Sequence, residues 1–298
     1  MTIVGGVSVM HQTPDAVLLA AMLARSASTD LALATVVPAP WTGKGAQMDR
    51  DYRDHLVSVA GATVSRLARS VPEDVECRID VRQSASVSEG LVEAVGEEEA
   101  PILVLGSSTA GLIGRVSLGS VTERLMHSSP VPVAVAPRGF STRDTQRVTR
   151  VTIAYAVGPD ETSMVKQASQ LAGSINATTR LVSFAVRPEA PLTSGVGPRA
   201  EQEVLDEWEA FQQKAAGRLR SQLERLDPAP EQEAPTVGRG TTWAQALKSV
   251  PWAEGDVLVV ASSRSARSAR VFLGSTASKI SRHSPVPVIV VPRRALKR

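Results

Sequence analysis

Cysteine and aromatic residues are scarce in this chain of 298 residues. Cys77 is the only cysteine, so no disulfide can form within the chain. We expect its side chain to be buried as a small hydrophobe. Phe, Trp and Tyr together make up 3% of the residues, so the core must be built from Val, Leu, Ile and Ala. Such a composition favours buried parallel strands covered by helices.

Signals for membranes, nucleic acids and metals are also lacking. No apolar run approaches the roughly 18 residues of a membrane span, and the sequence does not open on a secretion signal, so we expect a cytoplasmic protein. The net charge of +3 is too small to predict nucleic-acid binding. The four histidines show no ligand spacing, so no metal site is expected.

A repeat dominates what is present. Residues 101–138 align without gaps to residues 256–293, with 17 identities in 38 positions. The length also matches two domains of about 150 residues. We therefore predict two copies of one domain, at residues 1–139 and 147–298, joined by a polar linker.

Within each copy, apolar runs alternate with helical patterns. In the first half the runs lie at 2–9, 31–37, 75–81, 101–106 and 131–136. Strict alternation predicts an α/β domain with a five-stranded, mostly parallel sheet and helices on both faces. In the second half, residues 200–226 predict a long helix with Phe211 on its inner face.

The repeated block carries the chemistry. In the first copy a strand ends at Gly106, Thr109 follows, and Gly119-Ser120 begins a helix. A glycine at a strand end and free N–H groups at a helix start suit a phosphate. The same residues also fit a ligand-free helix start, in which Ser120 and Glu123 form a capping box. Spacing alone leaves both readings open.

These positions resemble the signature of the universal stress protein family, Gly-x2-Gly-x9-Gly-Ser/Thr. The segment Leu118–Arg124 and the proline-flanked valine run that follows it also resemble sequences of that family. The resemblance covers essentially the whole chain. It implies a tandem stress-response protein of adenine nucleotide alpha hydrolase-like, Rossmann-like fold. It also implies that the last strands of the two halves pair antiparallel as a pseudo-dimer, which associates further into a homodimer.

One subclass of the family binds ATP in this loop. The resemblance therefore implies an adenine-nucleotide site in the first domain, with Val36 beside the adenine. The residues around the phosphates and ribose would be Leu105, Gly106, Thr109, Gly119, Ser120 and Val121.

Departures from the family pattern weaken that implication. Thr109 replaces a glycine, and Val7 stands where the family has an aspartate at the end of the first strand. In the second half Ala156 takes the place of that aspartate, and Ala261 and Arg264 replace two glycines. We expect the second site to be lost.

Two rival readings remain. The first is a nucleotide-free interaction module, in which Arg264, Arg267 and Arg270 contact an acidic partner or anion; the same loop also reads as simply solvated. The second is a ligase or hydrolase of the related fold. No residue stands out as an activated nucleophile or tuned acid, so we expect a protein that is not an enzyme.

Overall fold

The computed structural model describes residues 2–10, 12–38, 46–110, 112–143, 145–155, 161–186, 198–226, 229–261 and 274–291. The first half contains β1 (Thr2–Gly6), α1 (Asp15–Ala27), β2 (Asp30–Pro38), α2 (Ala46–Ala68), β3 (Cys77–Ser84), α3 (Val87–Glu97), β4 (Leu103–Gly106), α4 (Ser120–Ser128) and β5 (Val133–Ala136). The second half contains β6 (Arg150–Ala154), α5 (Glu161–Ser174), β7 (Thr178–Val186), α6 (Pro198–Leu223), β8 (Thr236–Gly240), α7 (Trp243–Lys248), β9 (Asp256–Ala261), α8 (Ser275–His283) and β10 (Val288–Val291).

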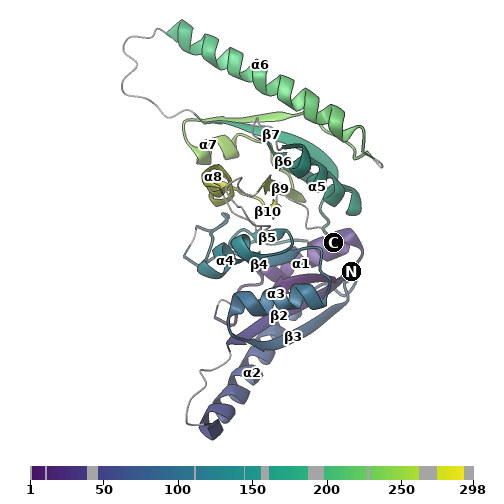
Figure 1. The fold of residues 1–298 in the computed structure, drawn as a ribbon, viewed down its shortest axis with the longest axis vertical. Coiled ribbons are helices and arrows are strands. Elements are labelled where there is room, and N and C mark those ends of the chain that lie inside the picture. Colours follow the sequence, from purple (N-terminus) through teal and green to yellow (C-terminus); the bar gives the residue numbers. More distant parts are fainter. Residues whose placement is uncertain are drawn as a thin grey trace.

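All these strands form one sheet of ten, in the order β3-β2-β1-β4-β5-β10-β9-β6-β7-β8. Figure 1 shows this sheet running through the whole molecule. Within each half the neighbouring strands are parallel. The halves meet at an antiparallel pair in which Val135 opposes Val288 and Ala134 opposes Ile289. The predicted α/β fold and the pseudo-dimer joined through the last strands are confirmed.

The two faces of the sheet carry separate cores, and each core is continuous across both halves. Helices α1, α2, α5 and α6 cover one face, and α3, α4, α7 and α8 cover the other. Successive strand residues alternate between the two cores: Val104 belongs to the first and Leu103 to the second. Every residue of β5 and β10 is buried. The apolar edge that each half would expose alone is therefore covered by the other half.

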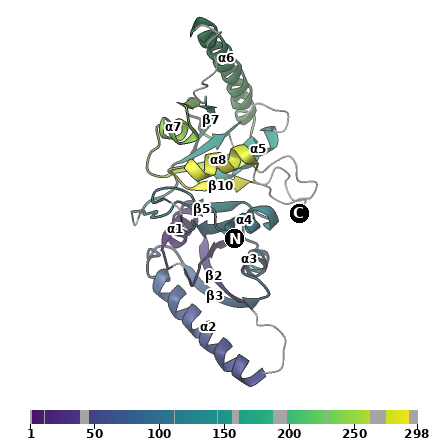
Figure 2. The ribbon, with the colours of Figure 1, turned by 90° about the vertical axis from the view of Figure 1, so that its left-hand side faces the viewer.

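Two sequence expectations fail at the periphery. Cys77 is exposed rather than buried, because it begins β3, the strand at one edge of the sheet. Phe211 is 51% exposed although it was expected on the inner face of its helix. The inner face of α6 is formed instead by the buried residues Gln212, Ala216, Leu219 and Leu223. Helices α2 and α6 lie at opposite ends of the molecule (Figure 2). Over the described residues, no helix has the length and apolar character of a membrane span.

Candidate functional site

The repeated motif of the first half lies at the carboxyl edge of the sheet, between β1 and β4. These two strands are neighbours. The chain after β1 leads to α1 on one face, whereas the chain after β4 leads to α4 on the other. The strand order therefore reverses at this point, and open parallel sheets bind ligands where that happens.

The loop between Gly106 and Gly119 folds back on itself and is held by hydrogen bonds. Ser108 N donates to the Ser117 carbonyl at 2.7 Å. The buried Ser107 Oγ donates to the Ala136 carbonyl at 2.6 Å and accepts from Ser117 N at 3.0 Å. The fold-back places Ser108 beside the start of α4, where a Cβ on Gly119 would lie 3.5 Å from Ser108 Cβ. The beginning and the end of the motif thus meet at one mouth.

Helix α4 begins without a side-chain cap. Its N-cap is Gly119, with φ −85° and ψ 169°, and among the described residues no side chain accepts from its first turn. By contrast, Ser86 caps α3 by accepting from Glu89 N at 3.2 Å. The predicted capping box of Ser120 and Glu123 is therefore wrong, because Ser120 is already the first helical residue. The positive end of α4 faces the mouth with its N–H groups unsatisfied by a cap.

The seven predicted site residues divide into two groups. Gly106, Thr109, Gly119, Ser120 and Val121 belong to the strand end, the loop and the helix start that form the mouth. Val36 and Leu105 are only 5% and 4% exposed, with side chains in the core beneath α3 and α4. A Cβ on Gly6 would lie 2.8 Å from Leu105 Cδ2, and one on Gly90 would lie 2.8 Å from Val36 Cγ1. The side chains of these two residues are therefore part of the core rather than of the mouth.

A buried carboxylate does occur near the mouth, at a position that the motif did not point to. Asp15, in the first turn of α1, is 2% exposed and accepts from Gly139 N at 3.0 Å. Burial raises the pKa of Asp15, against the opposing effects of the Gly139 hydrogen bond and the Arg138 charge. Its carboxylate thus holds the start of the linker to α1. The Pro14-Asp15 helix start was its only signal in the sequence.

The motif loop also contacts the second half directly. Gly114 N donates to the Arg138 carbonyl at 2.8 Å, and Arg138 N donates to the Arg115 carbonyl at 2.9 Å. The Arg115 Nη1 donates to the carbonyl of His283, the last residue of α8, at 2.7 Å. Cations at a helix C-terminus are favourable. The loop is therefore attached to the linker and to the other domain.

Comparison with known proteins assigns the family. The sequence profile described as the Universal stress protein family matches residues 1–137 and again residues 148–292. The chain belongs to the universal stress protein family. Universal stress proteins of Mycobacterium tuberculosis and Mycobacterium bovis are each 37% identical to it over 299 residues, which cover 98% of this chain and 100% of theirs. It is thus a tandem member.

Solved structures agree on the fold. A universal stress protein from Archaeoglobus fulgidus aligns with a TM-score of 0.56 and 14% identity, over 98% of both chains. A Pseudomonas aeruginosa protein described as functionally unknown aligns with a TM-score of 0.58 and 14% identity, over 98% of this chain and 92% of that one.

The second copy of the universal stress motif keeps its helix start. Gly274 is the N-cap of α8 in the same extended backbone as Gly119, with φ −67° and ψ 163° and no side-chain cap. Strand β9 ends at Ala261, where β4 ends at Gly106. The arginines Arg264, Arg267 and Arg270, and also Ala156, lie outside the described residues. Within the described ranges, no group of three or more His, Cys, Asp or Glu side chains is arranged to hold a metal ion.

Proposed function

We propose that the first domain of this universal stress protein binds an adenine nucleotide, ATP, and acts as a cytoplasmic binding protein rather than an enzyme. The observation that carries the proposal is the uncapped start of α4, which the fastened loop holds beside the end of β4 at the switch point of the sheet. Gly106 and Gly119 border this mouth, and neither has a side chain to fill it.

The phosphates would be held mainly by backbone. The N–H groups of Ser120 and Val121 lie in the uncapped first turn, and a helix N-terminus carries about half a positive charge. The Thr109 hydroxyl would add a donor in place of the closer backbone approach that glycine allows. Leu105 and Val36 would contribute backbone next to the ribose and the adenine. No described side chain of the mouth forms a nucleophile–base pair, so the proposal includes no chemical step.

The sharpest test is Gly119→Glu. The backbone at Gly119 has a negative φ, and a Cβ there meets nothing closer than 3.5 Å, so the fold can accept glutamate. The new carboxylate would take the place of a phosphate at the helix end. Repulsion between charges about 4 Å apart costs roughly 1–4 kcal/mol at effective dielectrics of 80 to 20. ATP affinity should therefore fall by between about fivefold and several hundredfold.

The matched control is Gly96→Glu, which adds the same charge to the same domain at a helical position with open space around it. Titration calorimetry with ATP should show one site per chain of equal affinity for the wild type and the control, and the weaker affinity for Gly119→Glu. A second measurement is the amount of adenine nucleotide released when the purified protein is denatured. Absence of binding to the wild type would favour the nucleotide-free interaction module, and two sites per chain would show that the second half binds as well.

A further inference from the structure

A second hollow lies between the two domains, away from the seven residues of the proposed nucleotide site. Its volume is about 680 Å³, within the usual range for small-molecule sites. One side is formed by the linker segment 137–143 and by Gly114 and Arg115 of the motif loop. The opposite side is formed by segments 252–256 and 285–287 of the second domain. Because the linker joins the halves only once, this cavity is a product of the tandem chain rather than of either domain.

Positive charge predominates in the cavity lining. Four cationic side chains line it, from Arg115, Arg138, Arg143 and Lys248. Two carboxylates oppose them. The charge of Asp256 is already neutralised by Arg150, which does not line the cavity and donates to the two carboxylate oxygens at 2.8 and 2.7 Å.

Glu254, the second carboxylate, is 67% exposed and lies 3.3 Å from the Arg143 Nη2. An exposed pair of this kind is worth little and is readily exchanged for another anion. The net field inside the cavity is therefore positive.

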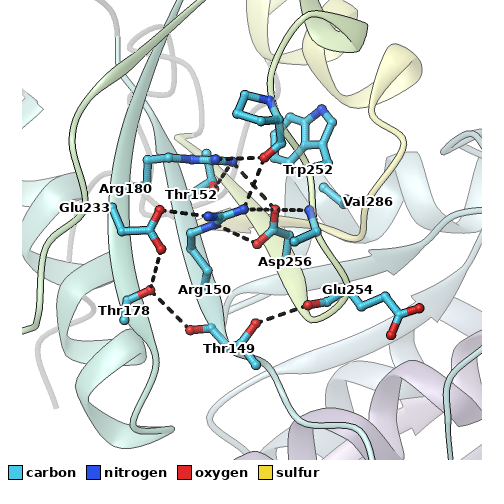
Figure 3. Close-up of polar contacts among 12 residues, drawn as sticks. Thr149, Arg150, Thr152, Thr178, Arg180, Glu233, Trp252, Glu254, Asp256 and Val286 are labelled. Carbon is cyan, nitrogen blue, oxygen red and sulfur yellow. Dashed lines mark hydrogen bonds and ion pairs between the residues drawn. The ribbon is translucent and has the colours of Figure 1, made fainter.

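Part of the remaining lining is apolar, and its Trp252 is held in place; Ser141, Thr142 and Gln146 add polar groups. Trp252 donates from Nε1 to the Leu247 carbonyl at 2.7 Å, and the Arg180 guanidinium lies 5.4 Å from the centroid of its ring. Figure 3 shows Trp252 beside Arg180. The segment Pro285–Pro287 extends this wall, and Phe140 lines the opposite side. A wall fixed in this way is preorganised, so a ligand does not have to order it on binding.

We propose that this cavity binds a small phosphorylated molecule that carries an apolar or aromatic group. Arg143 and Lys248 would contact the phosphate from the exposed rim, and the apolar group would lie between Trp252 on one side and Phe140 on the other. Arginine matches phosphate geometry with paired N–H groups, and lysine adds a point charge. A ligand held there would touch the linker, the motif loop and the second domain at once.

The test uses phenyl phosphate as the probe and full-length protein carrying Gly119→Glu, so that the proposed nucleotide site is blocked. Calorimetry should show one phenyl phosphate per chain, with weaker binding of benzoate and of inorganic phosphate. The double substitution Arg143→Gln, Lys248→Gln should weaken binding about tenfold, the effect of roughly 1.4 kcal/mol from two exposed contacts. The control Arg69→Gln, Lys214→Gln removes the same charge from exposed positions outside the cavity and should leave binding unchanged.

Three results would overturn the proposal. The first is no binding at millimolar phenyl phosphate. The second is binding to the wild type but not to Gly119→Glu, which would place the ligand at the nucleotide site. The third is equal weakening by the cavity and control substitutions, which would indicate a general charge effect.

Discussion

The substitution Asp256→Asn should destabilise the second domain severely. Asp256 is 2% exposed at the start of β9 and is the centre of the polar cluster in Figure 3. It accepts from Arg150 at 2.8 and 2.7 Å and from Ala253 N at 2.8 Å, and Arg180 Nη2 lies 3.6 Å from the same carboxylate. Arg180 is 3% exposed and its pKa is lowered, first by burial and then by the charge of Arg150.

The amide would keep the shape of the side chain and remove its charge. Two neighbouring arginines would then share a single carboxylate, that of Glu233, whose side chain is 41% exposed. Removing one partner of a buried ion pair costs about 3–5 kcal/mol. That is a large part of the roughly 5–15 kcal/mol that stabilises a typical domain.

Urea unfolding followed by circular dichroism measures the loss. With a slope of about 2 kcal/mol per molar urea, the midpoint should fall by about 2 M at unchanged slope. Arg143→Gln is the control, because it breaks an exposed pair at 3.3 Å and should cost less than about 0.5 kcal/mol. A midpoint for Asp256→Asn equal to that of this control would refute the reasoning that the cluster is a charge-balanced unit.

Three further outcomes are expected. Burial raises the pKa of Asp15 above its ordinary value of 3.8, so the folded state keeps the Asp15 proton to higher pH than the unfolded state does. The free energy of unfolding should therefore fall as the pH rises from the unfolded to the folded pKa. Asp15→Asn should be more stable than the wild type at neutral pH, and urea unfolding at a series of pH values should show this difference vanish on acidification. Gly106→Ala should leave the melting temperature unchanged or slightly raised, since its Cβ would lie 3.7 Å from Ala16 Cβ and alanine loses less backbone entropy on folding than glycine, while calorimetry shows weaker ATP binding. Unchanged affinity would contradict the expectation that Ala261 contributes to loss of the second site. Residues 1–143 expressed alone should dimerise through the uncovered β5 in light-scattering measurements, and a monomer at every concentration would contradict this.

The fold was predictable because its signals are local and repeated. Buried parallel strands of Val, Leu, Ile and Ala leave continuous apolar runs, and the second copy shows which runs belong to the domain. Exposure at the edges was not predictable in this way. Cys77 is exposed because β3 is an edge strand, which residue type does not encode. Phe211 is exposed because it lies one position away from Gln212, which is on the buried face of α6.

The candidate site was located from the sequence, but its local geometry was not. The capping box failed because the turn before α4 puts Gly119 in the extended cap position, so Ser120 enters the helix regardless of its capping propensity. The contacts Arg115–His283 and Asp15–Gly139 join residues 168 and 124 positions apart. Contacts over such separations leave no local pattern in the sequence, and they become visible only in the folded chain.

The glycines of the mouth differ in kind from the glycines beneath it. Gly6 and Gly90 are required by packing, because a Cβ at either would lie 2.8 Å from a core side chain. Gly106 and Gly119 are not: a Cβ would meet nothing closer than 3.7 and 3.5 Å, and the φ of Gly119 is −85°. Glycine at such a position lowers the stability of the folded state by about 0.5–1 kcal/mol relative to alanine, and the packing does not require it. The second half shows that β9 forms with Ala261 at the equivalent strand end. A glycine that neither backbone nor core demands favours close approach of a group from outside the chain, and at the mouth of α4 this supports the proposed contact with a nucleotide phosphate.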